Sequence, residues 1–136
     1  MYNQILFSQR FTMTENGTSA VANVSARDFQ NIAISMVGSN DDSDNPAILS
    51  VRVKGSLQQE PPDFTSAATL DNEWSYIQLK DDFSDGFLDG NVGYVFDENG
   101  VTSLELNTSV LTWVAVEVFN YTSGIFTGQF VFKNNQ

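Results

Sequence analysis

The sequence predicts an all-β protein, a single antiparallel β-sandwich of eight or nine strands that spans residues 1–136. Three observations support this fold class. Apolar and polar residues alternate along most of the chain, as expected for strands that bury one face. Turn-forming Gly, Asn, Asp and Pro residues separate these segments at fairly regular intervals. No segment shows the periodicity of a long amphipathic helix. A jelly roll is preferred over an immunoglobulin-like sandwich.

The segments with strand character are residues 4–13, 18–24, 32–37, 48–54, 74–79, 92–96, 101–106, 112–121 and 126–133. The second is short, which leaves the strand count at eight or nine. Asn16-Gly17 is expected to form a turn after the first strand, because Asn-Gly readily takes the positive φ values of a hairpin loop. From the alternation, the predicted core consists of Leu49, Val51, Val53, Ile77, Leu79, Leu104, Leu106 and one face of residues 113–119.

The connection over residues 55–73 is the longest stretch without periodicity. Pro61-Pro62-Asp63 excludes a central strand there, since proline cannot donate a hydrogen bond to a sheet. Connections of this length in a compact domain tend to be functional.

Composition limits the chemistry. The chain contains no Cys and no His, so disulfides and the usual Ser or Cys triads, which depend on a base titrating near neutrality, are excluded. The N-terminal segment has no basic region followed by an apolar run of signal-peptide length, and no stretch is long enough to span a membrane. We therefore expect a soluble protein that is synthesised in the cytoplasm.

The charge is acidic and unevenly distributed, with a net value of −11. Residues 1–55 carry five acids and four bases, whereas residues 56–136 carry twelve acids and two bases. Nucleic acids and anionic lipids are bound by basic surfaces, and no basic stripe is present. We expect no nucleic-acid partner and no membrane partner.

An enzyme built from this composition would need a pair of carboxylates, as in glycosidases. Glu105 and Glu117 are the best candidates, because each interrupts an apolar strand. Charges with a purely structural role far outnumber catalytic ones, so the prediction is that the protein has no catalytic residues and is not an enzyme.

Metal binding is restricted to oxygen ligands, and therefore to Ca²⁺ or Mg²⁺. Two acidic loops, residues 40–45 and 81–91, contain enough carboxylates, but neither has the spacing of an EF-hand. Asp and Asn are also ordinary turn residues. The prediction is that no metal or other cofactor is required. The fallback site lies in the second loop and consists of Asp81, Asp82, Asp85 and Asp89.

The last two predicted strands are apolar on both faces, whereas a sandwich strand needs only one buried face. Something must therefore cover the outer face, because large exposed apolar patches are rare on monomers. The two alternatives are a loop of the same chain, such as residues 56–73, and a subunit interface. The predicted interface residues are Trp113, Phe119, Tyr121, Phe126, Phe130 and Phe132.

A second functional class is a carbohydrate-binding module or adhesin domain. Trp74, Tyr76, Trp113 and Tyr121 would supply a platform on which sugars stack, beside an acidic loop. Aromatic side chains in strands are more often anchors of a core or an interface, so this remains the alternative.

Residues 54–133 contain a series of short characteristic segments: Lys54-Gly55-Ser56-Leu57, Pro62-Asp63-Phe64, Trp74-x-Tyr76-Ile77-Gln78-Leu79, Leu106-Asn107-Thr108, Trp113-Val114-Ala115-Val116 and Tyr121-Thr122-Ser123-Gly124. With these segments, this part of the chain resembles small structural proteins of tailed-bacteriophage particles. The resemblance implies a small β-sandwich located in the virion, such as a capsid decoration (cement) protein or a minor capsid protein. It further implies a homo-oligomer, often a trimer, whose partner is the major capsid protein or another virion protein. A head-fibre base, a tail component and a small coat protein remain open.

Overall fold

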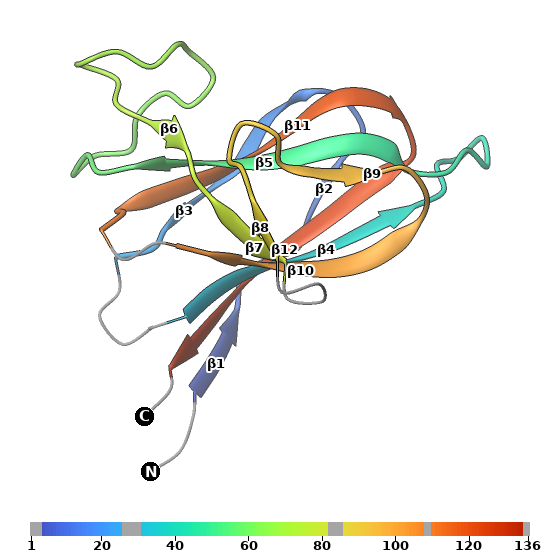
Figure 1. Cartoon of the computed structure of the whole chain (residues 1–136), viewed down its shortest axis with the longest axis horizontal. Helices are drawn as coiled ribbons and strands as arrows, with labels where there is room; N and C mark the ends of the chain where they lie inside the picture. Colours follow the sequence, from blue (N-terminus) through green and yellow to red (C-terminus); the bar gives the residue numbers. More distant parts are fainter. Residues whose placement is uncertain (1–3, 26–30, 82–85, 108–109, 135–136) are drawn as a thin grey trace.

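The computed structural model describes residues 4–25, 31–81, 86–107 and 110–134. All helix-or-strand structure in these ranges is β-strand, and the strands form two antiparallel sheets that pack face to face (Figure 1). The predicted all-β sandwich is therefore confirmed, while the preference for a jelly roll stays a prediction. The described residues contain no helix long and apolar enough to cross a membrane.

The seven-stranded sheet has the order β1–β12–β4–β10–β7–β8, with β2 also paired to β12. Its strands are β1 (Gln4–Phe7), β2 (Phe11–Met13), β4 (Asn31–Ser39), β7 (Leu79–Asp81), β8 (Gly86–Leu88), β10 (Gly100–Leu106) and β12 (Ile125–Asn134). The five-stranded sheet has the order β3–β11–β5–β6, with β9 also paired to β5. Its strands are β3 (Gly17–Asn23), β5 (Ile48–Ser56), β6 (Ser75–Tyr76), β9 (Tyr94–Phe96) and β11 (Trp113–Ser123).

Two of the predicted strands are divided in the structure, which helps to explain why the described residues form twelve strand segments. Residues 8–10 leave the ladder between β1 and β2, while Ser8 still exchanges hydrogen bonds with the backbone of Phe130, both 2.9 Å long. The predicted strand 74–79 is split because the chain crosses between sheets there. The Ile77 amide donates to Val53 of the five-stranded sheet, and Leu79 then pairs with Leu106 of the other.

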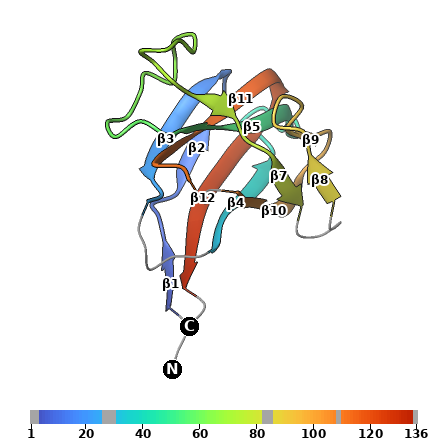
Figure 2. The same cartoon turned by 60° about the vertical axis from the view of Figure 1, so that its left-hand side comes forward.

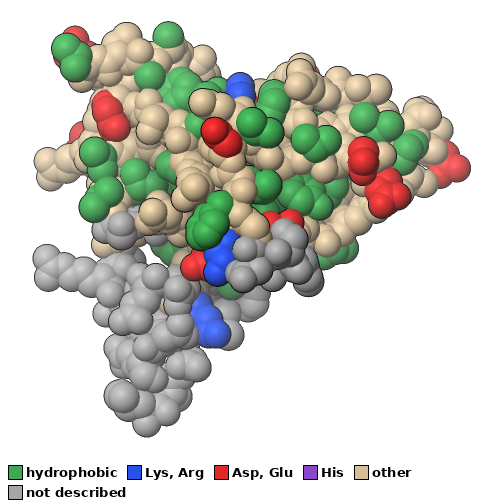
Figure 3. Space-filling view, in the orientation of Figure 1, with side chains coloured by type: hydrophobic (Ala, Val, Ile, Leu, Met, Phe, Trp, Pro, Cys, Tyr) green, Lys and Arg blue, Asp and Glu red, His purple; other side chains and the backbone are tan. Residues whose placement is uncertain are grey.

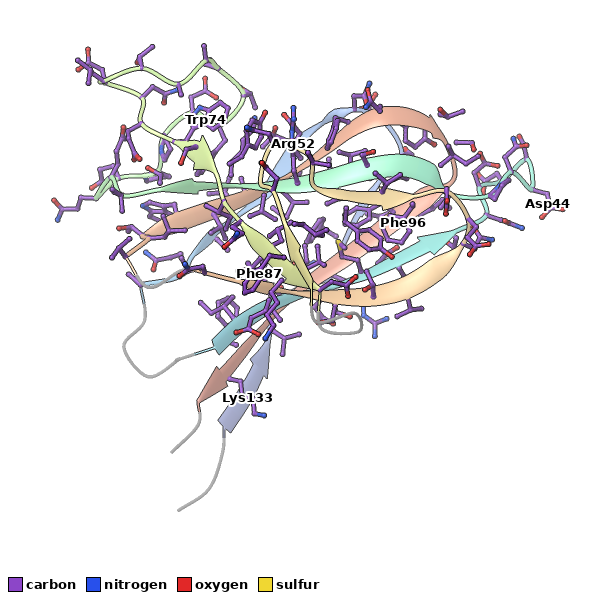
Figure 4. The ribbon with its side chains drawn as sticks, in the orientation of Figure 1. Asp44, Arg52, Trp74, Phe87, Phe96 and Lys133 are labelled. Carbon is purple, nitrogen blue, oxygen red and sulfur yellow. The ribbon has the colours of Figure 1, made fainter. Side chains whose placement is uncertain are left out.

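The core fills the space between the sheets, where Phe96 lies in Figure 4. All the core residues predicted individually are buried, and Val114, Val116 and Val118 supply the inward face of β11. The alternation of apolar and polar residues therefore identified the core correctly. The aromatic rings of Phe126 and Phe130 occupy this same space, and each is at most 2% exposed.

Two backbone irregularities interrupt the register of β11. Opposite Val114–Val116, strand β3 contains one extra residue, and Ala20 there has a φ of 59°. Near the end of β11 the register with β5 shifts after Phe119, and Asn120 has a φ of 52°. After the second irregularity, the Tyr121 side chain packs against the core. The simple alternation of faces therefore ends at residue 119.

The hairpin between β11 and β12 turns at Gly124, which has a φ of 92°. A Cβ atom at this position would lie 2.3 Å from the Cα atom of Ala47, so the turn requires glycine. At the other end of β12, residues 131–134 pair with β1, and this part of the sheet extends beyond the rest of the sandwich (Figure 2).

Candidate interaction surfaces

The outward side of β5 and β11 is covered by the chain itself, and we call it the covered face. Lys54, Ser56 and Ala115 point away from the core, yet each is at most 4% exposed. The connection over residues 57–74 lies on this side of the sheet, next to β6 (Figure 1). Of the two alternatives for the apolar outer face, a loop of the same chain therefore accounts for this part of it.

Lys54 is the centre of the covered face. Its Nζ donates to the Phe64 carbonyl at 2.6 Å and to Thr18 Oγ1 at 3.0 Å. It also lies 3.2 Å from Glu117 Oε2 and 4.3 Å from the centroid of the Trp74 ring. A buried ammonium group needs partners of this kind, because removing it from water is costly. The side chain thereby ties the loop to three strands.

Glu117 connects Lys54 to the second base of this face, Arg52. The Arg52 Nε group donates to Glu117 Oε1, and Arg52 Nη1 donates to the Asn91 carbonyl at 2.8 Å. The Arg52 guanidinium carbon lies 4.0 Å from the ring centroids of both Tyr76 and Phe119, so the group is held between two aromatic faces. Figure 4 shows Arg52 and Trp74 on this side of the sandwich.

The ionisation states follow from these contacts. Burial acts to raise the pKa of Glu117, but the hydrogen bonds from Arg52 and Lys54 lower it by more, so the pKa of this carboxyl lies below its usual value. Burial, aided by the negative charge of Glu117, raises the pKa of the Tyr76 hydroxyl, which donates to Glu117 Oε1 at 3.1 Å. At neutral pH Glu117 is therefore a carboxylate and the Tyr76 hydroxyl is neutral.

The covering loop is itself tightly held. Trp113 Nε1 donates to the Gln59 carbonyl at 3.1 Å, and Trp74 Nε1 donates to the Ser66 carbonyl at 2.9 Å. The loop closes where Asn72 Oδ1 accepts from the Asp63 amide at 2.7 Å and Asn72 Nδ2 donates to the Asp63 carbonyl at 2.8 Å. Residues 57–74 are thus a structural cover rather than an open lid.

The structure separates the six predicted interface residues. Phe126 and Phe130 are core side chains, so their prediction as partner contacts is corrected: on β12 the alternation points them between the sheets. Phe132 packs against the edge of the same core, and Tyr121 donates from its hydroxyl to the Gly124 carbonyl at 2.7 Å. Trp113 and Phe119 lie on the covered face, against the loop and Arg52. A subunit interface made by these residues stays a prediction only for the four that are partly exposed, which are Trp113, Phe119, Tyr121 and Phe132.

The acidic loops have local hydrogen-bonding roles. In the loop over residues 40–45, the Asp41 carboxylate accepts from the amides of Ser43 and Asn45 at 3.0 Å and of Gly124 at 3.2 Å. These backbone donors hold the pKa of Asp41 below its usual value. In the fallback metal loop Asp89 accepts from the Asn91 amide, while Asp82 and Asp85 lie outside the described residues. The described part of the chain contains no group of three potential metal ligands.

The aromatic platform and the carboxylate pair are not assembled. The Trp74 and Tyr76 rings meet edge to face at an interplanar angle of 78°, which gives no flat surface for a sugar. Trp113 and Tyr121 are eight residues apart on one strand, which is roughly 26 Å. Glu105 lies on the outer side of one sheet and Glu117 on the outer side of the other, so they cannot act on one bond.

A hollow of about 430 Å³ lies at the side of the sandwich, between β2 and β3. Its apolar walls come from Phe11, Phe130 and Ala20–Ala22, and its rim from Ser8, Gln9 and Arg10. The hollow exists because residues 8–10 leave the sheet on one side and β3 is distorted by its extra residue on the other. Neither irregularity was predicted from the sequence.

The outward side of the seven-stranded sheet, which we call the open face, differs from the covered face. Most of its central side chains are uncharged and come from aligned positions of β12, β4 and β10, while Glu105 of β10 lies in the row of Val131 and Ala33, opposite Lys80 of β7. The uncharged side chains are Thr127, Gln129, Val131, Ala33, Ser35, Val37, Val101 and Ser103. Phe87 extends the row of Val131 and Ala33 on β8, and both Phe87 and Val101 are 68% exposed. The side chains labelled Phe87 and Arg52 in Figure 4 belong to opposite faces.

The cluster around Lys54 was not predicted from the sequence. The predicted inward residues Leu49, Val51 and Val53 leave Arg52 and Lys54 on the outward face, but Glu117 was considered only as a possible acid of a catalytic pair. The sequence contained one signal. Two bases at alternate positions of one strand, in a chain this acidic, indicate that acidic or carbonyl groups lie near that face of the strand. Their partners, Phe64, Trp74 and Glu117, are distant in sequence and depend on the sheet pairing.

This fold defines a β-sandwich protein with one self-covered face and one open face. The crystal structure of SPBc2 prophage-derived protein YomS is similar to it, with a TM-score of 0.60, 10% sequence identity, and coverage of 97% of this chain and 96% of that chain. At this identity the likeness shows the fold alone. No protein-family model matches the sequence. No curated protein matches it either.

Proposed function

We propose that this protein is a non-enzymatic structural component of a phage particle, a capsid decoration or minor capsid protein that self-associates on the particle. The observation that supports this most is the likeness to a prophage-derived protein over nearly the whole length of both chains. The resemblance of residues 54–133 to virion proteins, found independently from the sequence, points to the same class.

The described side chains agree with a structural role. The charged groups of the covered face have structural partners. Glu117 pairs with both Lys54 and Arg52, and these two bases also donate hydrogen bonds to the carbonyls of Phe64 and Asn91. The chain has no His or Cys to act as base, nucleophile or soft metal ligand. The carbohydrate-binding alternative has no comparable support, since its four aromatic residues do not form a shared surface.

The proposed partners are a second copy of this chain and the major capsid protein or another virion protein, and the proposed location is the virion. The test is to purify particles of the phage that encodes the chain through a density gradient and to quantify their proteins by mass spectrometry. We expect the protein at a fixed ratio to the major capsid protein. A non-virion protein of the same phage serves as the control for carry-over. Presence in infected cells with absence from particles would overturn the proposal.

A further inference from the structure

The strand edges of the sandwich are poor sites for self-association. In the described residues, each edge strand is either short or irregular: β1, β2, β6, β8 and β9 have two to four residues, and β3 carries the extra residue at Ala20. Short and bulged edges are the usual devices that prevent edge-to-edge pairing between proteins. A contact between two copies therefore has to use a face of a sheet.

The part of the covered face around Lys54 is also a poor site, because the loop over residues 57–74 already covers it. A partner would have to displace the contacts of Lys54 with Phe64 and Glu117, which would leave a buried charge without partners. The outward side of the seven-stranded sheet has no such cover among the described residues.

Charge favours the open face for contact between copies. The chain has a net charge of −11, so two copies repel each other wherever their acidic surfaces meet. Most described acids lie elsewhere, in the loops at residues 41–44, 60–73 and 97–98, and Figure 3 shows acidic side chains at the tip of the molecule where Figure 4 labels Asp44. The central rows of the open face carry Glu105, which lies opposite Lys80 in the register. A self-complementary contact needs this neutrality.

The area of the open face is near the lower limit for a specific interface. Strand spacing of about 4.8 Å and a rise of about 3.3 Å per residue give roughly 500 Å² for each copy over the aligned parts of β2, β12, β4, β10, β7 and β8. Two copies would bury roughly 1,000 Å², which is about the minimum for a specific contact. The association is therefore expected to be weak in free solution and to increase with concentration.

We propose that the open face is a self-association surface on which a second copy of this chain docks with its own open face, related by a twofold axis. A face that meets its own counterpart makes an isologous contact, which closes as a dimer. The inference deepens the proposed self-association and rests on it, and it replaces the trimer implied by the sequence resemblance with a twofold unit.

The test is sedimentation equilibrium of the full chain from micromolar to millimolar concentration. We expect the mass to rise from 15.0 kDa toward twice that value. Raising the salt concentration should strengthen the dimer, because salt screens the repulsion between the acidic remainders of the two copies while the neutral contact is unaffected.

Ser35 lies in the middle of the open face, between Gln129 and Ser103, and provides the decisive variants. Both Ser35→Glu and Ser35→Lys should weaken the dimer about tenfold or more, because either charge would be buried at the contact. The matched controls are Val95→Glu and Val95→Lys on β9, at a position 56% exposed on the other sheet. In these controls the dimer affinity should change only through the net charge of the chain. Val95→Glu should weaken the dimer slightly, and Val95→Lys should strengthen it slightly. Circular dichroism and melting temperature establish that all four variants fold.

A protein that stays at 15.0 kDa throughout, a trimer, or a dimer that tolerates both Ser35 variants would overturn this inference. The proposed function is judged separately by particle composition. A virion protein that does not dimerise through this face refutes only the contact, whereas absence from particles refutes the function and leaves the measured dimer to stand by itself.

Discussion

The two outer faces of this sandwich are made from strands of similar length, but they differ in their cover. A loop of the chain packs on the covered face, and no described loop packs on the open face. On the covered face, Lys54 Nζ donates to the Phe64 carbonyl of the loop at 2.6 Å and lies 3.2 Å from Glu117 Oε2 on the neighbouring strand. On the open face, Ser35 and Ser103 lie on a surface that no described loop covers, and its charged side chains in the central rows are Glu105 and the opposite Lys80. The comparison separates intramolecular covering from a surface that is available to a partner.

The difference also teaches how an acidic chain distributes its few bases. Arg52 and Lys54 are two of only six bases in the protein, and both are on the covered face with Glu117 between them. Lys54 binds the Phe64 carbonyl of the covering loop, and Arg52 lies between the rings of Tyr76 and Phe119.

The largest expected effect concerns the core that both faces share. Phe130→Ala should lower the free energy of unfolding by about 4 kcal/mol, because a ring that is 2% exposed is replaced by a cavity. Urea unfolding gives this value. Val131→Ala, one position along and facing outward, is the control and should cost less than about 1 kcal/mol. If Phe130→Ala keeps the wild-type stability but self-associates less strongly, Phe130 belongs to an interface and not to the core.

The covered face should be nearly as sensitive to loss of its carboxylate. Glu117→Ala is expected to cost about 3 kcal/mol, because it leaves Lys54 buried with a reduced set of partners and removes the anchor of Arg52. Glu105→Ala on the open face is the matched control and should change stability by less than about 1 kcal/mol. Equal effects of the two substitutions would contradict the distinction between the faces.

The core was predictable because burial of one strand face leaves a local record in the sequence. Alternation alone located Leu49, Val51 and Val53, but it left open which face of residues 113–119 is buried. On β12 alternation also points Phe126 and Phe130 inward, because Thr127 and Gln129 lie on the other face, but the prediction treated this strand as apolar on both faces and so misplaced the two rings. The contacts that cover the outward face of β5 and β11 join Lys54 to Phe64, 10 positions away, and to Glu117, 63 positions away. Contacts between residues so far apart leave no local pattern in the sequence.

A smaller effect should come from the anchor of the covering loop. Trp113→Phe keeps an aromatic ring but removes the hydrogen bond to the Gln59 carbonyl, at a cost of about 1 kcal/mol. Limited proteolysis should show faster cleavage within residues 57–74, while cleavage elsewhere is unchanged. If the whole domain becomes susceptible at the same rate, the loop is not an independent cover but part of the cooperative fold.

The smallest expected effect is the pH dependence that Glu117 adds to stability. The pKa of this carboxyl is lower in the folded protein than its ordinary value of 4.5, so the folded state binds the proton less readily than the unfolded state. The stabilisation is therefore fully present above that ordinary value and is lost as the pH falls through the lower pKa of the folded state.

Many acids titrate in this range, and the pKa of Asp41 and of Asp63 is also lowered by hydrogen bonds. The informative quantity is consequently the difference between wild type and Glu117→Gln, in which the other acids cancel. This difference, measured by urea unfolding, should be constant near neutrality and shrink below about pH 4.5. A difference that stays constant down to pH 2.5 would mean that the cluster around Lys54 does not depend on the charge of Glu117.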